Sequence, residues 1–457
     1  MDGLYSTWER SRKGREMRRM MSCALGVPSL LAVATSTGDP VREVPVDETR
    51  VKILREFRAP GGDPDRQFGY SVAIDGDLVC VANDQGEADA LGSGRIHLLR
   101  LDQNDIPQEI VLRAPDRKWP DRFGSAMCLQ QGRLLAGAPM DAENGWDAGA
   151  VWLFEGVDSD WRLSARLQPE ESEEGAWFGA AVDLDDDLAV IGSPRTDGVG
   201  LDCGSVQLFR KLQDRWVAES VLIAPDQASG DYFGSSVACH DQWIAIGAWG
   251  DDDHGEKTGA VWLFTRDGTS WSAVQKIVPP EAEARDRFGW RVDFMGGRLV
   301  VSACGVDESR GRVYVHDFNG KAWVQTARLE DPQGHSGDWF GFSLSTRGSL
   351  LVVGSPGATT HAKWSGRVSV YRDQGTSWER LGAISSESDL GEQPVQFGWA
   401  VATDGEAVVV GRIDDADGPP VAGRAWLLGV PEVPSPTESH QHPIETIGAA
   451  ADTVRDW

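Results

Sequence analysis

The dipeptide Phe-Gly recurs seven times at nearly constant spacing, and this repeat constrains the fold more than any other feature of the chain. The copies begin at Phe68, Phe123, Phe178, Phe233, Phe288, Phe340 and Phe397, so successive intervals are 55, 55, 55, 55, 52 and 57 residues. A small residue follows each Phe-Gly glycine after 13 residues, and a further glycine follows after 25 residues, or 22 in the fifth copy. A length change confined to one interval indicates a loop between rigid elements. One repeat architecture can therefore account for most of a chain whose 457 residues would otherwise suggest several domains.

Each period reads as four short strands. The first follows Phe-Gly, as at 71–74, and a tight turn leads to the second, as at 134–138. The third is the run 149–154 and its equivalents, and the fourth begins at a tryptophan in five copies: Trp161, Trp216, Trp271, Trp323 and Trp378. The inner strands are almost continuously apolar, which is typical of strands with both faces buried. Seven such units predict an all-β fold, a seven-bladed β-propeller of four-stranded antiparallel blades.

The two ends of the repeat region predict how the ring closes. Residues 49–60 read as a fourth strand but precede the first Phe-Gly, whereas the last repeat stops after its third strand at 422–428. We therefore expect residues 50–59 to complete the blade that contains Phe397, so that pairing of the chain ends closes the propeller. The propeller should span residues 49–430. Residues 431–457 begin with three spaced prolines and continue as a polar stretch, which predicts a disordered tail.

The first residues have the layout of a secretory signal. Six basic residues between positions 10 and 19 precede a short apolar run that ends in small residues at Ala34. The run is too short to span a bilayer, and no other segment reads as a membrane span. We expect residues 1–48 to be a signal peptide and linker, which predicts a secreted, extracytoplasmic or cell-surface protein with no integral membrane segment in the mature chain.

Charge and cysteine content narrow the classes of partner. The 71 acidic residues exceed the 44 basic ones, which gives a formal net charge of -27. Such an excess repels phosphate backbones and anionic lipid, so it disfavours binding to nucleic acid or to a membrane surface. The six cysteines do not form an evident disulfide framework. Most lie inside apolar strand-like runs, where a buried thiol is the ordinary interpretation.

The recurring sequence patterns carry a family resemblance. Phe-Gly-x-Ser-Val-Ala, Gly-Ser/Ala-Pro and Gly-x-Val-x-Leu-Phe hold their register over residues 50–430, and the second pattern occurs at 137–139, 192–194 and 354–356. This resembles the FG-GAP repeats of the integrin α-subunit propeller and their bacterial relatives. The resemblance implies a propeller used for adhesion or binding. WD40 repeats have a shorter period, and the double glycine of kelch repeats does not recur here.

The resemblance also raises the question of calcium, because integrin-like repeats often carry an acidic loop between the first two strands. Calcium needs several oxygen ligands that converge on one point. Here that connection is a tight turn. Asp183, Asp185 and Asp187 have a suitable spacing, but the segment lacks the glycine and the room for a loop. The sequence therefore predicts no cofactor and does not support a calcium site.

Acidic and aromatic residues gather in the connections between second and third strands. These loops should emerge on the same face as the blade-to-blade connections, which add Asp121, Asp231, Asp286 and Asp338. Aromatic residues within a charged rim suit contact with a protein or a carbohydrate. The alternative is a solvated acidic rim with tryptophans packed between blades. The candidate ligand-binding residues are Asp141, Trp146, Asp147, Trp249, Asp251, Asp252, Asp253, Asp307, Trp364, Asp414, Asp415 and Asp417.

The sequence contains no recognisable catalytic motif. Gly-x-Ser-x-Gly, His-Glu-x-x-His, phosphate-binding glycine loops and Cys-x-x-Cys pairs do not occur. We therefore expect no catalytic residue and no enzyme, but a non-enzymatic extracytoplasmic scaffold for protein or glycan binding or adhesion. A propeller hydrolase acting on extracellular glycans is one alternative. It would need polar groups at the ring axis, where the inner strands read as Val, Ala, Leu and Gly. A purely structural cell-surface module is the other alternative.

Overall fold

The computed structural model describes residues 50–58, 67–84, 93–101, 109–115, 121–268, 270–360, 363–385, 395–413 and 423–431. The chain separates into two compact units, 1–47 and 48–457, and all of the described residues belong to the second. The predicted signal peptide and linker (1–48) lie outside the described ranges, as do Asp414, Asp415, Asp417 and the predicted tail beyond residue 431.

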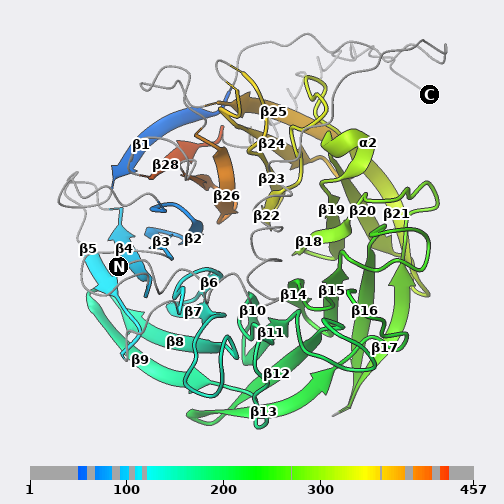
Figure 1. Ribbon diagram of the computed structural model, residues 1–457. Coiled ribbons are helices and arrows are strands. Elements are labelled where there is room, and N and C mark those ends of the chain that lie inside the picture. The colour runs from blue at the N-terminus through cyan, green and yellow to red at the C-terminus, as the bar shows by residue number, and fades with distance from the viewer. Residues whose placement is uncertain are drawn as a thin grey trace, which may run out of the picture. The chain divides into compact units, whose positions relative to one another are not determined.

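The described residues of the second unit form 28 strands in seven antiparallel sheets of four strands each (Figure 1). Blade 1 contains β2 (Ser71–Asp75), β3 (Leu78–Asn83), β4 (Arg95–Arg100) and β5 (Glu109–Leu112). Blade 2 contains β6 (Met127–Gln130), β7 (Arg133–Ala138), β8 (Ala150–Val157) and β9 (Asp160–Leu167). Blade 3 contains β10 (Ala181–Asp185), β11 (Leu188–Ser193), β12 (Ser205–Leu212) and β13 (Arg215–Leu222). Blade 4 contains β14 (Ser236–His240), β15 (Trp243–Ala248), β16 (Ala260–Asp267) and β17 (Ser270–Ile277).

The remaining blades follow the same order from the axis outward. Blade 5 contains β18 (Phe288–Met295), β19 (Arg298–Ala303), β20 (Arg312–Phe318) and β21 (Trp323–Leu329). Blade 6 contains β22 (Ser343–Arg347), β23 (Leu350–Ser355), β24 (Arg367–Asp373) and β25 (Trp378–Ile384). Blade 7 contains β26 (Phe397–Thr403), β27 (Ala407–Arg412), β28 (Arg424–Gly429) and β1 (Lys52–Arg58). A short turn, α2 (Val306–Ser309), joins β19 to β20, and its Asp307 and Glu308 have left-handed φ values of 50° and 56°. The predicted seven-bladed propeller is confirmed.

The spacing of the glycines within the repeat is explained by the contact between neighbouring blades. Gly149, just before β8, bridges Phe178 at the start of blade 3, and four further blade pairs repeat this bridge. A Cβ on Gly149 would collide with the carbonyl oxygen of Phe178. A Cβ on Gly137, in β7, would likewise collide with the carbonyl of Gly179. Both markers are therefore glycine because the next Phe-Gly backbone passes against them.

The hydrophobic core is divided among the blade interfaces. Seven clusters of buried side chains lie in the described residues, and each joins one blade to the next. The phenylalanines of all seven Phe-Gly pairs are at most 1% exposed. The second strands of blades 1, 3 and 6 are buried along their whole length. No sheet buries its apolar faces alone, so each blade is stabilised by its neighbours.

The seventh blade is completed by the N-terminal strand. β1 pairs antiparallel with β28 from Lys52–Gly429 to Arg58–Arg424, with an irregularity between Ile53 and Arg55, and the two strands lie side by side in Figure 1. Phe57 of β1 is buried in the cluster that joins blade 7 to blade 1. The predicted closure by residues 50–59 is therefore confirmed over its described part.

Two further observations concern membranes and thiols. No helix among the described residues is long and apolar enough to cross a bilayer. Cys80, Cys128, Cys203, Cys239 and Cys304 are free thiols, and all but Cys128 are buried. These five cysteines therefore contribute to packing and not to a disulfide framework.

Candidate ligand-binding face

The loops between second and third strands share one face with the blade-to-blade connections, as predicted from the sequence. Backbone hydrogen bonds join the two sets directly. The amide of Gly175 donates to the carbonyl of Trp146 at 2.7 Å, and that of Trp177 donates to Asp147 at 3.1 Å. An equivalent bond in the next interface runs from Tyr232 to Asp202 at 3.1 Å. We call this side of the propeller the loop face.

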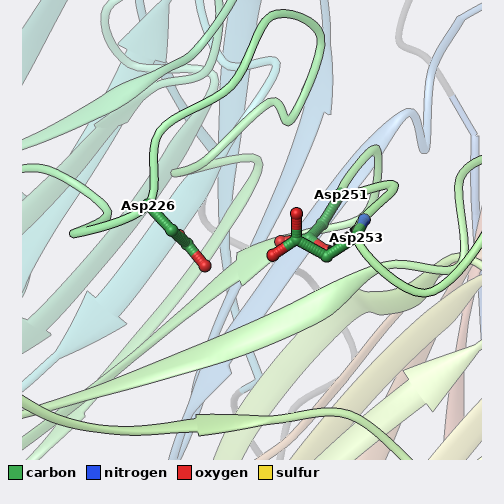
Figure 2. A group of neighbouring side chains, drawn as sticks. All are labelled: Asp226, Asp251 and Asp253. Atoms are coloured by element: carbon green, nitrogen blue, oxygen red, sulfur yellow. Dashed lines mark hydrogen bonds between the residues drawn. The ribbon is translucent and has the colours of Figure 1, made fainter.

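Two of the predicted acidic residues come together on this face with a third that was not predicted. The carboxylates of Asp251 and Asp253 lie close together, and that of Asp226 is directed toward them (Figure 2). The Lys276 ammonium on β17 lies 2.7 Å from a carboxylate oxygen of each aspartate. Burial raises the pKa of Asp251, whereas the hydrogen bond from Lys276 lowers the pKa of Asp253.

The cluster is best explained as a structural ion pair network. Among the described residues these three aspartates are the one group whose ligand atoms converge closely enough for a metal ion. However, the ammonium already contacts all three carboxylates and supplies the positive charge they require. Blade 2 contains an equivalent ion pair. Arg166 donates a hydrogen bond to the buried Asp141 at 2.8 Å, and its guanidinium carbon lies 4.7 Å from the centre of the Trp152 ring. The aspartate and its basic partner are 25 residues apart in both blades, Asp251 and Lys276 in blade 4 and Asp141 and Arg166 in blade 2.

The other predicted residues are distributed over several blades. Asp147 is buried, Asp252 is exposed, and the exposed Asp307 pairs with Arg312 at 3.0 Å. Trp146 is 54% exposed on the rim. Trp364 is half-buried under the Lys363 ammonium, 4.5 Å from its ring centre. The described candidates therefore do not form one common site.

The aspartates that precede Phe-Gly by two residues are buried turn residues, not the surface acids that the sequence suggested. Asp231, Asp286 and Asp338 each accept a hydrogen bond from the backbone amide three residues earlier, at 2.7–3.0 Å. Burial raises the pKa of Asp231 to about 6 and also raises those of Asp286 and Asp338. Asp121 is 1% exposed. These side chains stabilise the connections, because a buried amide needs an acceptor.

An extended aromatic surface near the axis includes one predicted residue, Trp249, but its other five rings were not among the predicted site residues. Six rings from blades 1, 4, 5, 6 and 7 form a continuous series of contacts, with neighbouring ring centres 4.7–5.9 Å apart. Trp249 and Tyr232 are stacked at an interplanar angle of 6°. We call this series the axial aromatic arc; its members, in order of contact, are Tyr70, Trp399, Phe342, Trp290, Trp249 and Tyr232.

The arc arises from positions that flank the Phe-Gly pair. Tyr70, Trp290, Phe342 and Trp399 each follow a Phe-Gly glycine directly, where the innermost strand of the blade begins. The innermost strands line the ring axis in Figure 1, so these positions lie at the end of the axis on the loop face. Comparing the seven copies at this one position would have revealed four of the six rings, because the other copies carry Ser125, Ala180 and Ser235.

The ring axis is more polar than the sequence analysis expected. No further strand pairs with the free edge of an innermost strand. Backbone amides on this edge instead donate hydrogen bonds to side chains of the preceding blade. The Cys239 amide donates to Asp183, and the Thr346 amide donates to Asp293, both at 2.7 Å. Burial, and the nearby charge of Asp183, raise the pKa of Asp293 to about 7.

Asp183, Asp185 and Asp187, which have the spacing of calcium ligands, also bind groups of the protein itself. Asp185 accepts a hydrogen bond from the Asp241 amide at 2.8 Å, and Asp183 accepts one from the Cys239 amide. Asp187 is exposed and lies 3.8 Å from the Arg133 guanidinium. Two of the three carboxylates therefore bind backbone amides of the next blade and are directed to different partners.

Comparison with known proteins supports the repeat assignment. The FG-GAP repeat model matches residues 161–209, 216–264, 271–316 and 323–371. Each match starts at the outer-strand tryptophan of one blade and runs through the three inner strands of the next. The WD40 domain of Toxoplasma gondii coronin is similar in structure, with a TM-score of 0.51 at 9% identity, covering 84% of this chain and 86% of that one. This likeness concerns the fold alone. A comparison with curated proteins gave no significant match.

Proposed function

Because the chain is a propeller that carries FG-GAP repeats, we propose that it is a non-enzymatic, extracytoplasmic binding or adhesion scaffold. Its partner, a protein or a carbohydrate, docks on the loop face over the ring axis. The signal-like arrangement of residues 10–34 supports the extracytoplasmic assignment.

The axial aromatic arc is the observation that carries this proposal. All of its rings except Trp249, which is 8% exposed, are half-buried and keep part of their surface accessible at the axis. An aromatic surface of this kind is typical of binding sites, because rigid rings give large contact area at little entropic cost. Trp146 adds an exposed ring on the rim of the same face.

The polar groups at the axis support a scaffold more than an enzyme. Asp183 and Asp293 each accept a backbone amide of the next blade, which is a structural role for a carboxylate on an innermost strand. Ser345 does the same for the Thr403 amide at 3.1 Å. The inter-blade hydrogen bonds therefore explain why polar residues interrupt the apolar pattern of these strands.

A hydrolase acting on glycans is the second candidate, and one observation favours it. Asp183 and Asp293 interact electrostatically, and the pKa of Asp293 is raised to about 7. Two neighbouring carboxyl groups, one of them with a pKa near neutral, are the pattern of a general acid and its partner, although burial raises the pKa of Asp183 as well. Release of reducing sugar from extracellular glycans, lost in Asp293→Asn, would support this candidate over the scaffold.

The scaffold proposal is tested by immobilising the full chain and measuring retention of a glycan array and of purified extracellular proteins. Trp399→Ser and Phe342→Ser place in blades 7 and 6 the residue that blades 2 and 4 already carry. Val157→Ser is the control, since that side chain is 75% exposed away from the arc. Retention that is lost in the arc variants and kept in the control supports the proposal. Equal retention by all variants, or no retained ligand, contradicts it.

A further inference from the structure

Two arginine side chains lie at the axial aromatic arc without a carboxylate partner among the residues that the structure describes. Arg287 precedes the Phe-Gly of blade 5, and Arg291 follows it on β18. Their guanidinium carbons are 5.9 and 5.8 Å from the centre of the Trp290 ring. Arg291 interacts electrostatically with Tyr70 of blade 1, so it reaches the axis from its own blade.

The environment of each guanidinium shows that its charge is not compensated. Arg291 donates to the Trp290 carbonyl at 3.3 Å, and no carboxylate contributes to its electrostatic environment in the described structure. Arg287 lies beside the Cys304 thiol, and its Nε has no hydrogen-bond partner among the described residues. Burial lowers the pKa of Arg291, as expected for a cation removed from water without a counter-charge.

In blade 2 the arginine at the position equivalent to Arg287 is paired with a carboxylate. Arg122 precedes the Phe-Gly of blade 2, and its Nε donates to the buried Asp84 of blade 1 at 2.7 Å. Asp84 lies 16 residues after Phe68, and the residue 16 positions after Phe233 is Trp249. Arg287 therefore meets an indole, 6.0 Å from its guanidinium carbon, where Arg122 meets a carboxylate. The chain has 71 acidic residues but places none of the described ones here.

Other polar atoms at the flanking positions also have no partner. Gln67 precedes the first Phe-Gly, and Ser125 follows the second. The Gln67 Oε1 and the Ser125 Oγ are buried and make no hydrogen bond within the described structure. Buried polar atoms are ordinarily satisfied, so unmatched donors and acceptors at the positions that flank Phe-Gly indicate a ligand or water that supplies the missing groups.

We propose that the loop-face end of the ring axis binds a carboxylate-bearing sugar, with Arg287 and Arg291 contacting the carboxylate and the half-buried Trp290 packing on the sugar ring. This rests on the proposed function and names its ligand class. A guanidinium pairs with a carboxylate through two parallel hydrogen bonds. Sugar hydroxyls both donate and accept, which suits the amide oxygen of Gln67 and the hydroxyl of Ser125.

The charge of the protein restricts the ligand further. A net charge of -27 and the acidic loops repel a chain with many anionic groups. A glycan with one carboxylate on an otherwise neutral unit avoids this repulsion. An acidic peptide would satisfy the arginines but offers fewer hydroxyl groups to the unmatched polar atoms, so the sugar is favoured.

The test uses the full chain on an array of uronic and sialic acid oligosaccharides, each paired with its methyl ester, together with acidic peptides. Arg287→Gln and Arg291→Gln remove the charges, and Arg162→Gln is the matched control on an outer strand, where the side chain is 79% exposed. We expect an acidic glycan to bind at least tenfold more tightly than its ester. Each axial variant should lose at least tenfold in affinity, and the control should lose none.

The stability of the same variants separates ligand binding from a structural role. An uncompensated guanidinium does not stabilise the fold, so both axial variants should keep or raise the melting temperature while they lose binding. A clear fall in melting temperature would indicate a structural cation and overturn the proposal. Equal binding of acid and ester, retention by acidic peptides alone, or unchanged affinity in the axial variants would also overturn it. Binding to neutral glycans that depends on the arc but not on the arginines would preserve the proposed function alone.

Discussion

The closure of the ring by β1 makes a quantitative prediction for Phe57. Its ring is 5% exposed and packs between blades 7 and 1, in the cluster that includes Phe68, Val409 and Leu427. Phe57→Ala leaves the β1–β28 backbone pairing possible but removes the side chain that holds β1 against the core. The substitution should therefore destabilise the ring at its closure.

The magnitude follows from the buried surface. A buried phenylalanine ring covers about 150 Å² of apolar surface, which at about 25 cal/mol per Å² corresponds to about 4 kcal/mol. Measured Phe→Ala substitutions in cores cost about 3–5 kcal/mol, in agreement. Ile53 lies on the same strand but is 52% exposed, so Ile53→Ala should cost about 1 kcal/mol or less.

Urea unfolding measures the loss in the free energy of unfolding, and hydrogen exchange locates it. Exchange of the β28 amides should accelerate in Phe57→Ala, because β1 covers the outer edge of β28. Amides of β15 and β16 in blade 4 serve as the internal reference. Equal losses in Phe57→Ala and Ile53→Ala, or equal acceleration in blade 4, would refute the role of β1 as the closing element.

Three further predictions concern buried charges. Lys276→Met should cost about 2–4 kcal/mol in urea unfolding, since it leaves the three aspartates unpaired, and millimolar calcium should recover part of the loss. Asp293→Asn should stabilise the fold by about 1–2 kcal/mol at pH 8, and by progressively less as pH falls from 7 to 4, because the raised pKa of about 7 makes ionisation in the folded state unfavourable. His316→Phe should become more stabilising as pH falls from 7.5 to 5, by about 2 kcal/mol, because burial lowers the pKa of His316 to about 4 and the unfolded chain takes up the proton first.

Controls and opposing outcomes for these three differ. Lys363→Met removes an exposed ammonium outside the cluster and should leave stability unchanged. If it loses as much unfolding free energy as Lys276→Met, the loss in Lys276→Met does not come from the aspartate network. A gain in Asp293→Asn that is independent of pH would show that ionisation is not responsible. Phenylalanine occupies the His316 position in blades 2, 3 and 4, so packing is matched. A pH-independent effect of His316→Phe would therefore exclude the histidine as the titrating group.

The fold was readable from the sequence because the repeat spacing is imposed by direct backbone contact. Gly137 and Gly149 must be glycine where the next Phe-Gly passes, so the markers stay in register even though loops vary. The pairing of β1 with β28 could be predicted by counting strands. The seventh blade lacked a fourth strand in sequence, and one strand preceded the first blade.

The candidate site was less predictable because burial and pairing depend on side chains from separate strands. Asp251 is an acidic loop residue in sequence, but Lys276 of the outer strand reaches it in space. The same spacing recurs between Asp141 and Arg166, which is the one sequence signal that could have identified both pairs. The acidic residues indicated the loop face, whereas most of the axial aromatic arc required comparison of one repeat position across all copies.

The pairing of β1 with β28 also has a consequence for synthesis. The ribosome completes β1 first and its partner strand last, from Lys52 to Gly429. At about 5–20 residues per second, β1 waits about 20–75 s with its edge amides and carbonyls unpaired. During that interval the nascent chain presents an open β-edge and the Phe57 ring to any neighbouring polypeptide. Efficient production of this protein therefore depends on shielding one short N-terminal strand until translation ends.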